Sequence, residues 1–285
     1  VLAVGCRFSS WMWDERGPLV RPPQRIVNVN LDPAALGFVP GDVSMLADAR
    51  LALRDVIAAL DSGAAEPDWV PSLAETRRAY AARLRQTEPG APMHPAALAA
   101  AIGDVLPADA LVTFDGGHTS FWSNDLTPAH APRTRFHEPG MSQLGFGLPA
   151  PPPLQAPHPG RPVVNITGDG SFGFTLQELD TARREGLPVV TIIHDNAEWG
   201  VIGLGQRKTY GETFGAALDG TDYAAVARGF GCHGERVTRL EEFAPALARA
   251  RASGLPAVLD CVTRFEPHPA MPAFGRMNRY GFAAG

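Results

Sequence analysis

The sequence predicts an α/β protein built on a doubly wound parallel sheet. Two apolar, β-rich runs at residues 163–167 and 189–193 enclose a segment with helical periodicity at residues 174–184. Gly186 is expected to end this helix, and Pro188 to prevent its continuation. Because parallel neighbours in a sheet need a crossover connection, the order strand, helix, strand indicates a βαβ unit.

Polar residues come directly after each of the two predicted strands. Gly168-Asp169-Gly170 comes after the first strand, and residues 194–198 come after the second. Since ligands of parallel sheets bind just beyond the carboxyl ends of the strands, both loops are expected at one ligand-binding edge. The two glycines let the backbone turn sharply beside Asp169 and approach a ligand closely.

The residues of the first loop suit a cation and a diphosphate. The N–H groups of Gly170, Ser171 and Phe172 stand at the expected start of a helix, where an anion is favoured. The Asp169 carboxylate, with a second oxygen from the neighbouring loop, suits Mg²⁺, which usually bridges carboxylates to phosphates. Asp-Gly alone is ordinary turn chemistry, so the prediction depends on the second loop, Asp195-Asn196, which follows one crossover helix later.

Taken together, these motifs resemble the cofactor motif of thiamine diphosphate (ThDP) enzymes. The resemblance rests on GDGSFGFTLQELDTARREGLPVV at residues 168–190, on Trp199-Gly200, and on TDYAAVARGFG at residues 221–231. It is narrowed to the acetohydroxyacid (acetolactate) synthase large-subunit-like group, which also holds benzaldehyde lyase, benzoylformate decarboxylase and oxalyl-CoA decarboxylase. The resemblance covers nearly the whole chain.

The resemblance implies four parts of the chain. Residues 1–62 are expected to be the C-terminal part of a Rossmann-like central domain, 63–92 a linker, 93–265 the ThDP diphosphate-binding domain, and 266–285 a C-terminal tail. The chain is expected to begin inside a domain, without the N-terminal pyrimidine-binding domain of relatives. The central domain of the synthases helps to hold FAD. Arg7 and Asp32 are therefore either remnants of an FAD site or a surface arginine and a turn aspartate.

The resemblance also assigns candidate site residues. Asp169, the side chain of Asn196 and the backbone carbonyl of Glu198 are the implied Mg²⁺ ligands. The implied contacts of ThDP are Gly117, His118, Thr119, Ser142, Leu144, Gly168, Asp169, Gly170, Ser171, Asn196 and Val201. Trp199, Val201 and Ile202 are the implied lining of the substrate pocket.

Simpler interpretations stand beside several of these roles. His118 could be a loop histidine with water partners, and we expect its backbone to matter more than its ring. Leu144 stands in the place of the apolar residue that bends the cofactor in relatives, but it could be a core leucine. Ser142 is implied to offer its carbonyl to the cofactor's amino group. An aromatic residue such as Trp199 is more often packing than pocket wall.

The sequence departs from the family pattern at three places. Asp195 replaces the first asparagine of the usual pair, and Gly205 stands where typical synthases carry tryptophan. Prolines occupy residues 151–153, 157 and 159, where relatives have a helix. Because proline in a helix interior costs about 3 kcal/mol, either this helix is lost or the run records a sequence error.

The implied function is a ThDP- and Mg²⁺-dependent enzyme that forms or cleaves C–C bonds of 2-keto acids or 2-hydroxyketones, most like an acetolactate synthase. Alternatives are a benzaldehyde lyase- or benzoylformate decarboxylase-like activity, or a non-catalytic ThDP-binding fragment. The activating glutamate is expected in the absent pyrimidine-binding domain, so no catalytic residue is assigned and the chain alone is expected to be inactive. A homodimer or homotetramer through the ThDP site is implied. A nucleotide-binding oxidoreductase is a third, competing hypothesis.

Composition limits what the core, the partners and the location of the chain can be. Hydrophobic residues make up 45% of the chain, which is enough for a full core, and the net charge of −5 offers no basic patch for nucleic acid. The sequence shows no membrane-spanning run, and a cytoplasmic location is expected. Cys6, Cys232 and Cys261 are scattered without metal-binding spacing, so free or buried thiols are expected.

Overall fold

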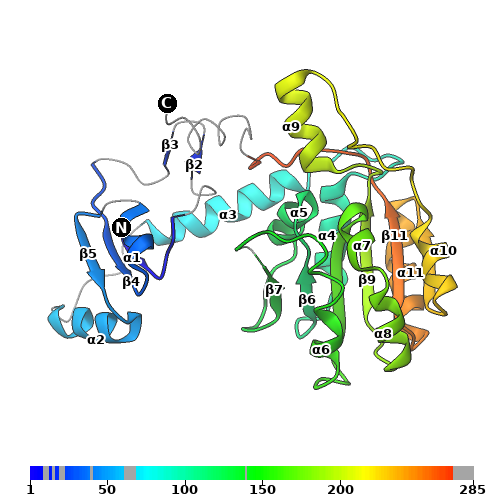
Figure 1. Ribbon diagram of the computed structural model, residues 1–285, viewed down its shortest axis with the longest axis horizontal. Helices are drawn as coiled ribbons and strands as arrows, with labels where there is room; N and C mark the ends of the chain where they lie inside the picture. The colour runs from blue at the N-terminus through cyan, green and yellow to red at the C-terminus, as the bar shows by residue number, and fades with distance from the viewer. Residues whose placement is uncertain are drawn as a thin grey trace. The chain divides into compact units, whose positions relative to one another are not determined.

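The computed structural model describes residues 1–8, 13–14, 17–18, 23–38, 41–60, 69–138 and 140–271. The chain divides into two compact units, with the division inside helix α3 (Val70–Leu84) after Leu73. Figure 1 shows both units, and each is described by itself. Most of the expected tail, residues 272–285, lies outside the described residues. Among the described residues, no helix combines the length and the apolar character needed to cross a membrane.

The first unit contains a small parallel sheet. In its described part, three strands pair in the order β1-β4-β5, and β2 pairs with β3 in an antiparallel ribbon. Its elements are β1 (Leu2–Val4), β2 (Trp13–Asp14), β3 (Gly17–Pro18), β4 (Val27–Asn30), α1 (Pro33–Phe38), β5 (Val43–Leu46) and α2 (Ala49–Ala59). Strands β1 and β4 fall within the β-rich runs of residues 1–5 and 25–30, and α2 falls on the amphipathic segment around residues 50–60.

The two candidate FAD residues lie on the surface of this unit. Arg7 and Asp32 are both exposed. The Asp32 carboxylate accepts a hydrogen bond from the Ala34 N–H at 2.9 Å, which satisfies a free donor in the first turn of α1. This geometry matches a turn aspartate.

The second unit is built on one larger sheet. Among its described residues, six strands pair in the order β10-β11-β9-β8-β6-β7, and every pair is parallel. The strands are β6 (Leu111–Phe114), β7 (Arg135–His137), β8 (Val163–Gly168), β9 (Val190–Asp195), β10 (His233–Val237) and β11 (Ala257–Val262). The predicted parallel α/β sheet is therefore confirmed.

Helices cover both faces of this sheet, as a doubly wound fold requires. Ile192 packs in the cluster that includes α4 (Pro95–Val105) and α11 (Leu240–Ala252). The next residue, Ile193, packs in the cluster that includes α8 (Glu178–Arg184) and α10 (Tyr223–Gly229). Because successive side chains of a strand point to opposite faces, these two clusters lie on opposite sides of the sheet (Figure 1).

The single helix predicted at residues 174–184 is wrong in its boundaries. The structure has α7 (Asp169–Thr175) and α8, joined by a tight turn in which the Leu179 N–H donates to the Leu176 carbonyl at 3.1 Å. Helix α7 begins directly at Asp169, so the Gly-Asp-Gly segment is a helix start and not a free loop. Phe174, the first residue of the predicted helix, belongs to α7 and not to α8, and it is 57% exposed.

The proline run keeps a short helix. Helix α6 (Pro151–Gln155) starts at the first proline. Prolines 151–153 fill its first turn, where the backbone N–H groups have no intrahelical acceptor, so the interior penalty does not apply. Of the two alternatives left open by the sequence, loss of this helix is therefore excluded.

Several elements carried no clear sequence signal. These are β5, β7, β10 and α5 (His118–Leu126). Strand β10 reads HGERV, with one buried residue, Val237. An edge strand of this kind lacks the continuous apolar run that marked β8 and β9.

Candidate functional site

Three loops meet at the carboxyl edge of the second unit's sheet. They follow β6, β8 and β9, which are neighbours in the sheet. Phe114 pairs with Ile166 and Gly168 pairs with His194, so the loop starts lie close together. The expectation that the Asp169 and Asn196 loops share one edge is confirmed.

The two predicted metal ligands converge on one donor. The Glu198 N–H lies 3.3 Å from Asp169 Oδ2 and 3.1 Å from Asn196 Oδ1, within hydrogen-bonding range of both. The other carboxylate oxygen, Asp169 Oδ1, accepts from the Gly170 N–H at 2.8 Å. The Asp169 residue is 3% exposed. Two oxygen ligands from neighbouring strands are thus brought together at the start of α7.

The electrostatics of this region favour a cation. Burial raises the pKa of Asp169 to about 7, and the nearby Asp195 carboxylate adds to the rise. Burial and the Asp195 charge likewise raise the pKa of Asp260. Asp195 and Asp260 share one guanidinium, that of Arg236, which forms no ion pair with Asp169 among the described residues. A bound divalent cation would supply the missing positive charge and restore the ionised form of Asp169.

The donor set suits a hard cation. Among the described residues, no group of three or more His, Cys, Asp and Glu side chains is placed to hold a metal. A site at Asp169 would instead combine one carboxylate, the Asn196 amide oxygen and the backbone carbonyl of Glu198. Oxygen donors of these kinds, completed by phosphate or water, are those that Mg²⁺ prefers.

Trp199 covers the start of α7. A Cβ added to Gly170 would lie 2.5 Å from the Trp199 ring, and the ring also meets Phe174 edge-on at a centroid distance of 5.6 Å. Glycine at position 170 therefore permits the indole to pack against this helix start. This packing accounts for the position of Trp199. Ser171, also predicted at the cofactor, is buried one residue further on.

The ring of His118 holds an unpaired donor. Its Nε2 accepts a hydrogen bond from the His268 N–H at 2.6 Å, so the neutral ring carries its proton on Nδ1. That Nδ1 is buried and has no hydrogen-bond partner among the described residues. Burial lowers the pKa of His118 to about 4, with further lowering by His268 and Lys208. The ring is thus a neutral donor beside the Gly117 turn.

The turn after β6 is shaped by close backbone contact. A Cβ on Gly116 would lie 2.5 Å from the Ser142 carbonyl oxygen and 3.1 Å from Leu144 Cδ2. Gly117 has a φ of +89°, and Ser142 has a φ of +53°. Leu144 therefore rests against the glycine turn, where the cofactor is expected, and not in the sheet core. Thr119 lies near Gly168, whose added Cβ would be 3.3 Å from Thr119 Oγ1.

Asp115 organises this edge, and the sequence interpretation missed it. Its Oδ1 accepts from the Gly116 and Gly145 N–H groups at 2.8 and 2.9 Å. Its Oδ2 accepts from the Gly147 N–H and the Thr167 hydroxyl, each at 3.1 Å. This buried carboxylate therefore ties the segment that carries Ser142 and Leu144 to the ends of β6 and β8. A polar residue at the end of a buried strand was the only available signal.

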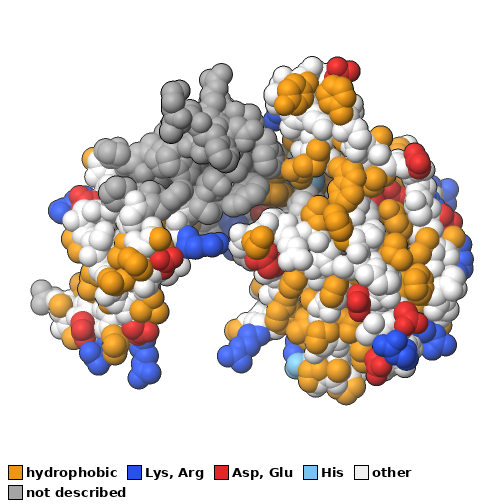
Figure 2. All heavy atoms as spheres, viewed as in Figure 1, with side chains coloured by type: hydrophobic (Ala, Val, Ile, Leu, Met, Phe, Trp, Pro, Cys, Tyr) orange, Lys and Arg blue, Asp and Glu red, His pale blue; other side chains and the backbone are white. Residues whose placement is uncertain are grey.

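The N-terminal half of α9 (Gly200–Tyr210) carries the predicted substrate-pocket residues. Val201 is half-buried, and Ile202 is 54% exposed. The Glu198 side chain lies over Gly203 and forms a bidentate pair with Arg207 at 2.5 and 3.2 Å. Nothing lies within 4 Å of a Cβ added to Gly205, so this side of α9 is open. Figure 2 shows apolar side chains gathered over this part of the second unit.

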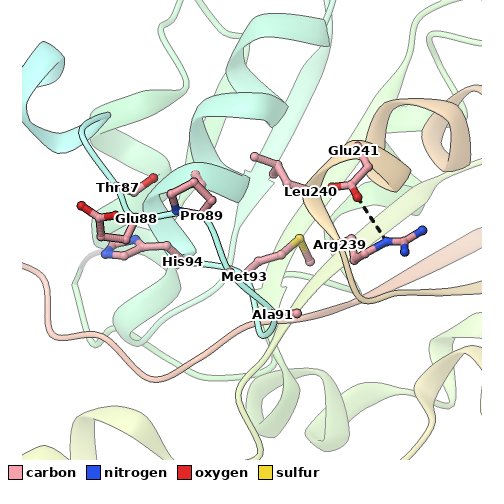
Figure 3. A pocket seen from close by; sticks show the side chains of 11 residues that line it. Thr87, Glu88, Pro89, Ala91, Met93, His94, Arg239, Leu240 and Glu241 are labelled. Atoms are coloured by element: carbon pink, nitrogen blue, oxygen red, sulfur yellow. Dashed lines mark ion pairs between the residues drawn. The ribbon is translucent and has the colours of Figure 1, made fainter.

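A cavity of about 570 Å³ lies elsewhere in the second unit (Figure 3). It is bordered by the segment from Thr87 to Ala97 and by the start of α11. Figure 3 shows the Arg239–Glu241 ion pair at its rim, with a separation of 3.2 Å. None of the predicted cofactor or metal residues lines it.

Fold and site together define an α/β domain whose parallel sheet presents buried oxygen donors and a helix start at the carboxyl ends of neighbouring strands. Residues 115–261 match the family model described as the thiamine pyrophosphate enzyme, C-terminal TPP-binding domain. The chain belongs to this family, as its motifs predicted.

Known relatives agree with this placement. The chain is 29% identical over 253 residues to an acetolactate synthase isozyme 2 large subunit of Escherichia coli, covering 87% of this chain and 44% of that protein. It is 32% identical over 271 residues to an acetolactate synthase large subunit of Parasynechococcus marenigrum, covering 93% and 43%. It resembles the structure of a ThDP-dependent 4-hydroxybenzoylformate decarboxylase of Rhodococcus jostii with a TM-score of 0.75 and 25% identity, covering 93% and 49%. The chain thus spans less than half the length of each of these relatives.

Proposed function

We propose that this chain carries the Mg²⁺- and diphosphate-binding part of a ThDP-dependent enzyme that forms or cleaves C–C bonds of 2-keto acids or 2-hydroxyketones. The observation that carries the proposal is the convergence of Asp169 Oδ2 and Asn196 Oδ1 on one N–H at the carboxyl edge of the sheet. When bound, ThDP supplies an electron sink that stabilises the negative charge left by cleavage next to a carbonyl.

The residues of this edge have separable roles in the proposal. Asp169, Asn196 and the Glu198 carbonyl would hold the cation, and the Ser171 N–H would face the diphosphate, while the Gly170 N–H orients the Asp169 carboxylate by donating to its Oδ1. The unpaired Nδ1–H of His118 donates to a phosphate oxygen, which would remove its unsatisfied state. Leu144 and the Ser142 carbonyl, set against Gly116, orient the organic part of the cofactor.

Calorimetry with Mg²⁺ and ThDP tests the binding part of this proposal. The chain is expected to bind ThDP when Mg²⁺ is present and to lose that binding when EDTA removes the metal. Binding that is indifferent to Mg²⁺ would contradict the assigned cation site. Because the resemblance places the activating glutamate outside the chain, binding without turnover is the expected behaviour of these residues alone.

We propose an acetolactate synthase-like reaction with a tolerant acyl pocket. The open space at Gly205 and the exposed side chains of Phe174 and Ile202 support acceptance of large or aromatic acyl groups beside pyruvate. An enzyme containing this chain is therefore expected to turn over both pyruvate and benzoylformate. Turnover is measured by the release of CO₂ and by the mass of the product. The Gly205→Trp variant should lose turnover of benzoylformate while keeping turnover of pyruvate. Strict conversion of pyruvate to acetolactate by the unmodified enzyme would contradict the tolerant pocket.

We also propose self-association through the ThDP site, as a homodimer or homotetramer. The exposed apolar side chains of Phe174 on α7 and Ile202 on α9 support it, since exposed apolar groups commonly mark an interface. Sedimentation of the enzyme with Phe174→Asp is the test. Weaker association is expected, and an unchanged oligomer would place the interface elsewhere.

A further inference from the structure

A buried group of charges lies behind the cation loop. Arg236 on β10 places Nη1 2.5 Å from Asp260 Oδ2 on β11 and Nη2 3.3 Å from Asp195 Oδ2 at the end of β9. Both carboxylate side chains are almost completely buried, whereas the Arg236 side chain is 31% exposed. One guanidinium therefore bridges two buried acids on two other strands.

Asp195 connects this guanidinium to the predicted ligands. While Oδ2 faces Arg236, Oδ1 accepts a hydrogen bond from the Ala197 N–H at 3.1 Å. Ala197 has a φ of +53°, a left-handed conformation that is uncommon for residues other than glycine. The next N–H, that of Glu198, points to Asp169 and Asn196. The orientation of Asp195 thus fixes the turn on which the two ligands converge.

Asp260 connects the same guanidinium to the other loop. Its Oδ2 also accepts from the Tyr223 N–H at 3.0 Å, at the start of α10. The Tyr223 ring meets Phe172 edge-on at a centroid distance of 5.4 Å. Phe172 lies in the first turns of α7, directly after the residues that face the diphosphate. Arg236 is therefore linked to both loops by short chains of contacts.

We propose that Arg236 is a positioning residue for the cation and diphosphate site, because it holds Asp195 in the orientation that aims Asn196 and the Glu198 carbonyl at the metal. This inference rests on the proposed function. Arg236 itself forms no hydrogen bond or ion pair with any of the three predicted ligands, and it acts through Asp195 and Asp260. Residues that orient metal ligands in this way typically change metal affinity 10–100-fold when they are replaced.

Charge and geometry make opposite predictions for the loss of Arg236. Its guanidinium is a positive charge paired with Asp195 and Asp260, and Asp195 immediately precedes the predicted ligand Asn196. By Coulomb's law alone, its removal should strengthen Mg²⁺ binding. If Arg236 positions the loop, its removal should weaken Mg²⁺ binding in spite of the more negative surroundings.

The first measurement is Mg²⁺ affinity at saturating ThDP, by titration calorimetry. Arg236→Met keeps much of the length of the side chain without its charge, and Arg236→Lys keeps a charge without the bidentate geometry. Arg249→Met is the matched control, because Arg249 also pairs with a carboxylate, that of Glu235 on β10, at 2.6 Å. We expect Arg236→Met to weaken Mg²⁺ binding by roughly 10-fold or more and Arg236→Lys to weaken it less. The control should bind Mg²⁺ with unchanged affinity. Equal or tighter binding by Arg236→Met would overturn the proposal.

The second measurement needs no cofactor. Hydrogen exchange of the Ala197 and Glu198 amides is compared among the same variants, with α4 and α11 as internal references. Faster exchange confined to residues 195–199 is expected for both Arg236 variants and not for Arg249→Met. Unchanged exchange at these amides would overturn the proposal. If the unmodified chain fails to bind Mg²⁺ and ThDP, the proposed function is wrong, while the exchange result still decides whether Arg236 positions the loop.

Discussion

The Asp169 carboxylate and the Asn196 amide oxygen share a single partner, the N–H of Glu198, at 3.3 and 3.1 Å. Both distances are at the long end of the range for N–H···O hydrogen bonds, so each interaction is weak. Bound Mg²⁺ prefers such oxygens at about 2.1 Å from the ion. The arrangement therefore brings the two oxygens together without engaging either of them strongly, which suits a site that is ready for a cation.

Asp115 is predicted to be a main support of the site edge. Asp115→Ala removes the acceptor of three backbone N–H groups and the Thr167 hydroxyl. Since each buried donor left unpaired costs about 1–3 kcal/mol, we expect the free energy of unfolding to fall by about 3 kcal/mol or more. Urea denaturation measures it. Thr167→Val, which removes one donor only, should cost about 1 kcal/mol. A loss below 1 kcal/mol for Asp115→Ala would show that these contacts do not hold the edge.

Gly170 is predicted to be required by the Trp199 ring. Gly170→Ala places a methyl group 2.5 Å from that ring and should destabilise the fold by about 1–3 kcal/mol, as overpacking does. Gly173→Ala is the matched control on the same helix, because nothing lies within 4 Å of its added Cβ. In a Trp199→Leu background, the cost of Gly170→Ala should shrink. Strictly additive effects in this double-mutant cycle would exclude direct contact as the cause.

The central sheet was predictable because its signals are local. The apolar runs that form β8 and β9 are long and β-rich, and the glycines and polar residues after them mark ligand loops. Their pairing as neighbours follows from the short crossover connection between them. The edge strand β10 has a polar sequence, so no periodicity identified it.

The missed parts of the site depend on contacts between residues that are distant in sequence. Nothing near Asp115 shows that Gly145 and Gly147 will donate to it, and nothing near Arg236 shows that Asp195 will face it. The break between α7 and α8 was also missed, because the apolar spacing of residues 174–184 fits one helix. Tertiary packing decided these features.

The ring of His118 is predicted to donate from Nδ1 to an anion. The amide nitrogen of asparagine occupies nearly the place of a histidine Nδ1, whereas that of glutamine occupies nearly the place of Nε2. His118→Asn should therefore keep most of the ThDP affinity, measured with Mg²⁺ by calorimetry. His118→Gln should lose about 10-fold, because a hydrogen bond to a charged group contributes about 1.5–3 kcal/mol. Tighter binding by the glutamine variant would assign the donor to the other nitrogen.

His118 should also contribute to acid sensitivity in the absence of cofactor. Burial lowers the pKa of His118 to about 4, against about 6.5 in an unfolded chain. A lowered pKa stabilises the folded state above pH 6.5, and this contribution is lost as the pH falls toward 4. Between pH 7.5 and pH 5, the loss from this one group is about 2 kcal/mol.

Chemical denaturation across this pH range, comparing the unmodified chain with His118→Asn, measures that contribution. The variant should show a shallower decline of the free energy of unfolding, while the other buried histidines remain as a common background. Parallel curves for the two proteins would mean that His118 titrates in the folded state as it does in the unfolded chain.

The most direct test of the account is titration of ThDP into the Asp169→Ala variant with Mg²⁺ present, beside the unmodified chain. Asp169 stands at the start of α7 and outside the strands, and its carboxylate is buried at an energetic cost, so the variant should unfold at a similar urea concentration. The account predicts Mg²⁺-dependent ThDP binding by the unmodified chain and none by the variant. Equal ThDP affinity in the two proteins would contradict it.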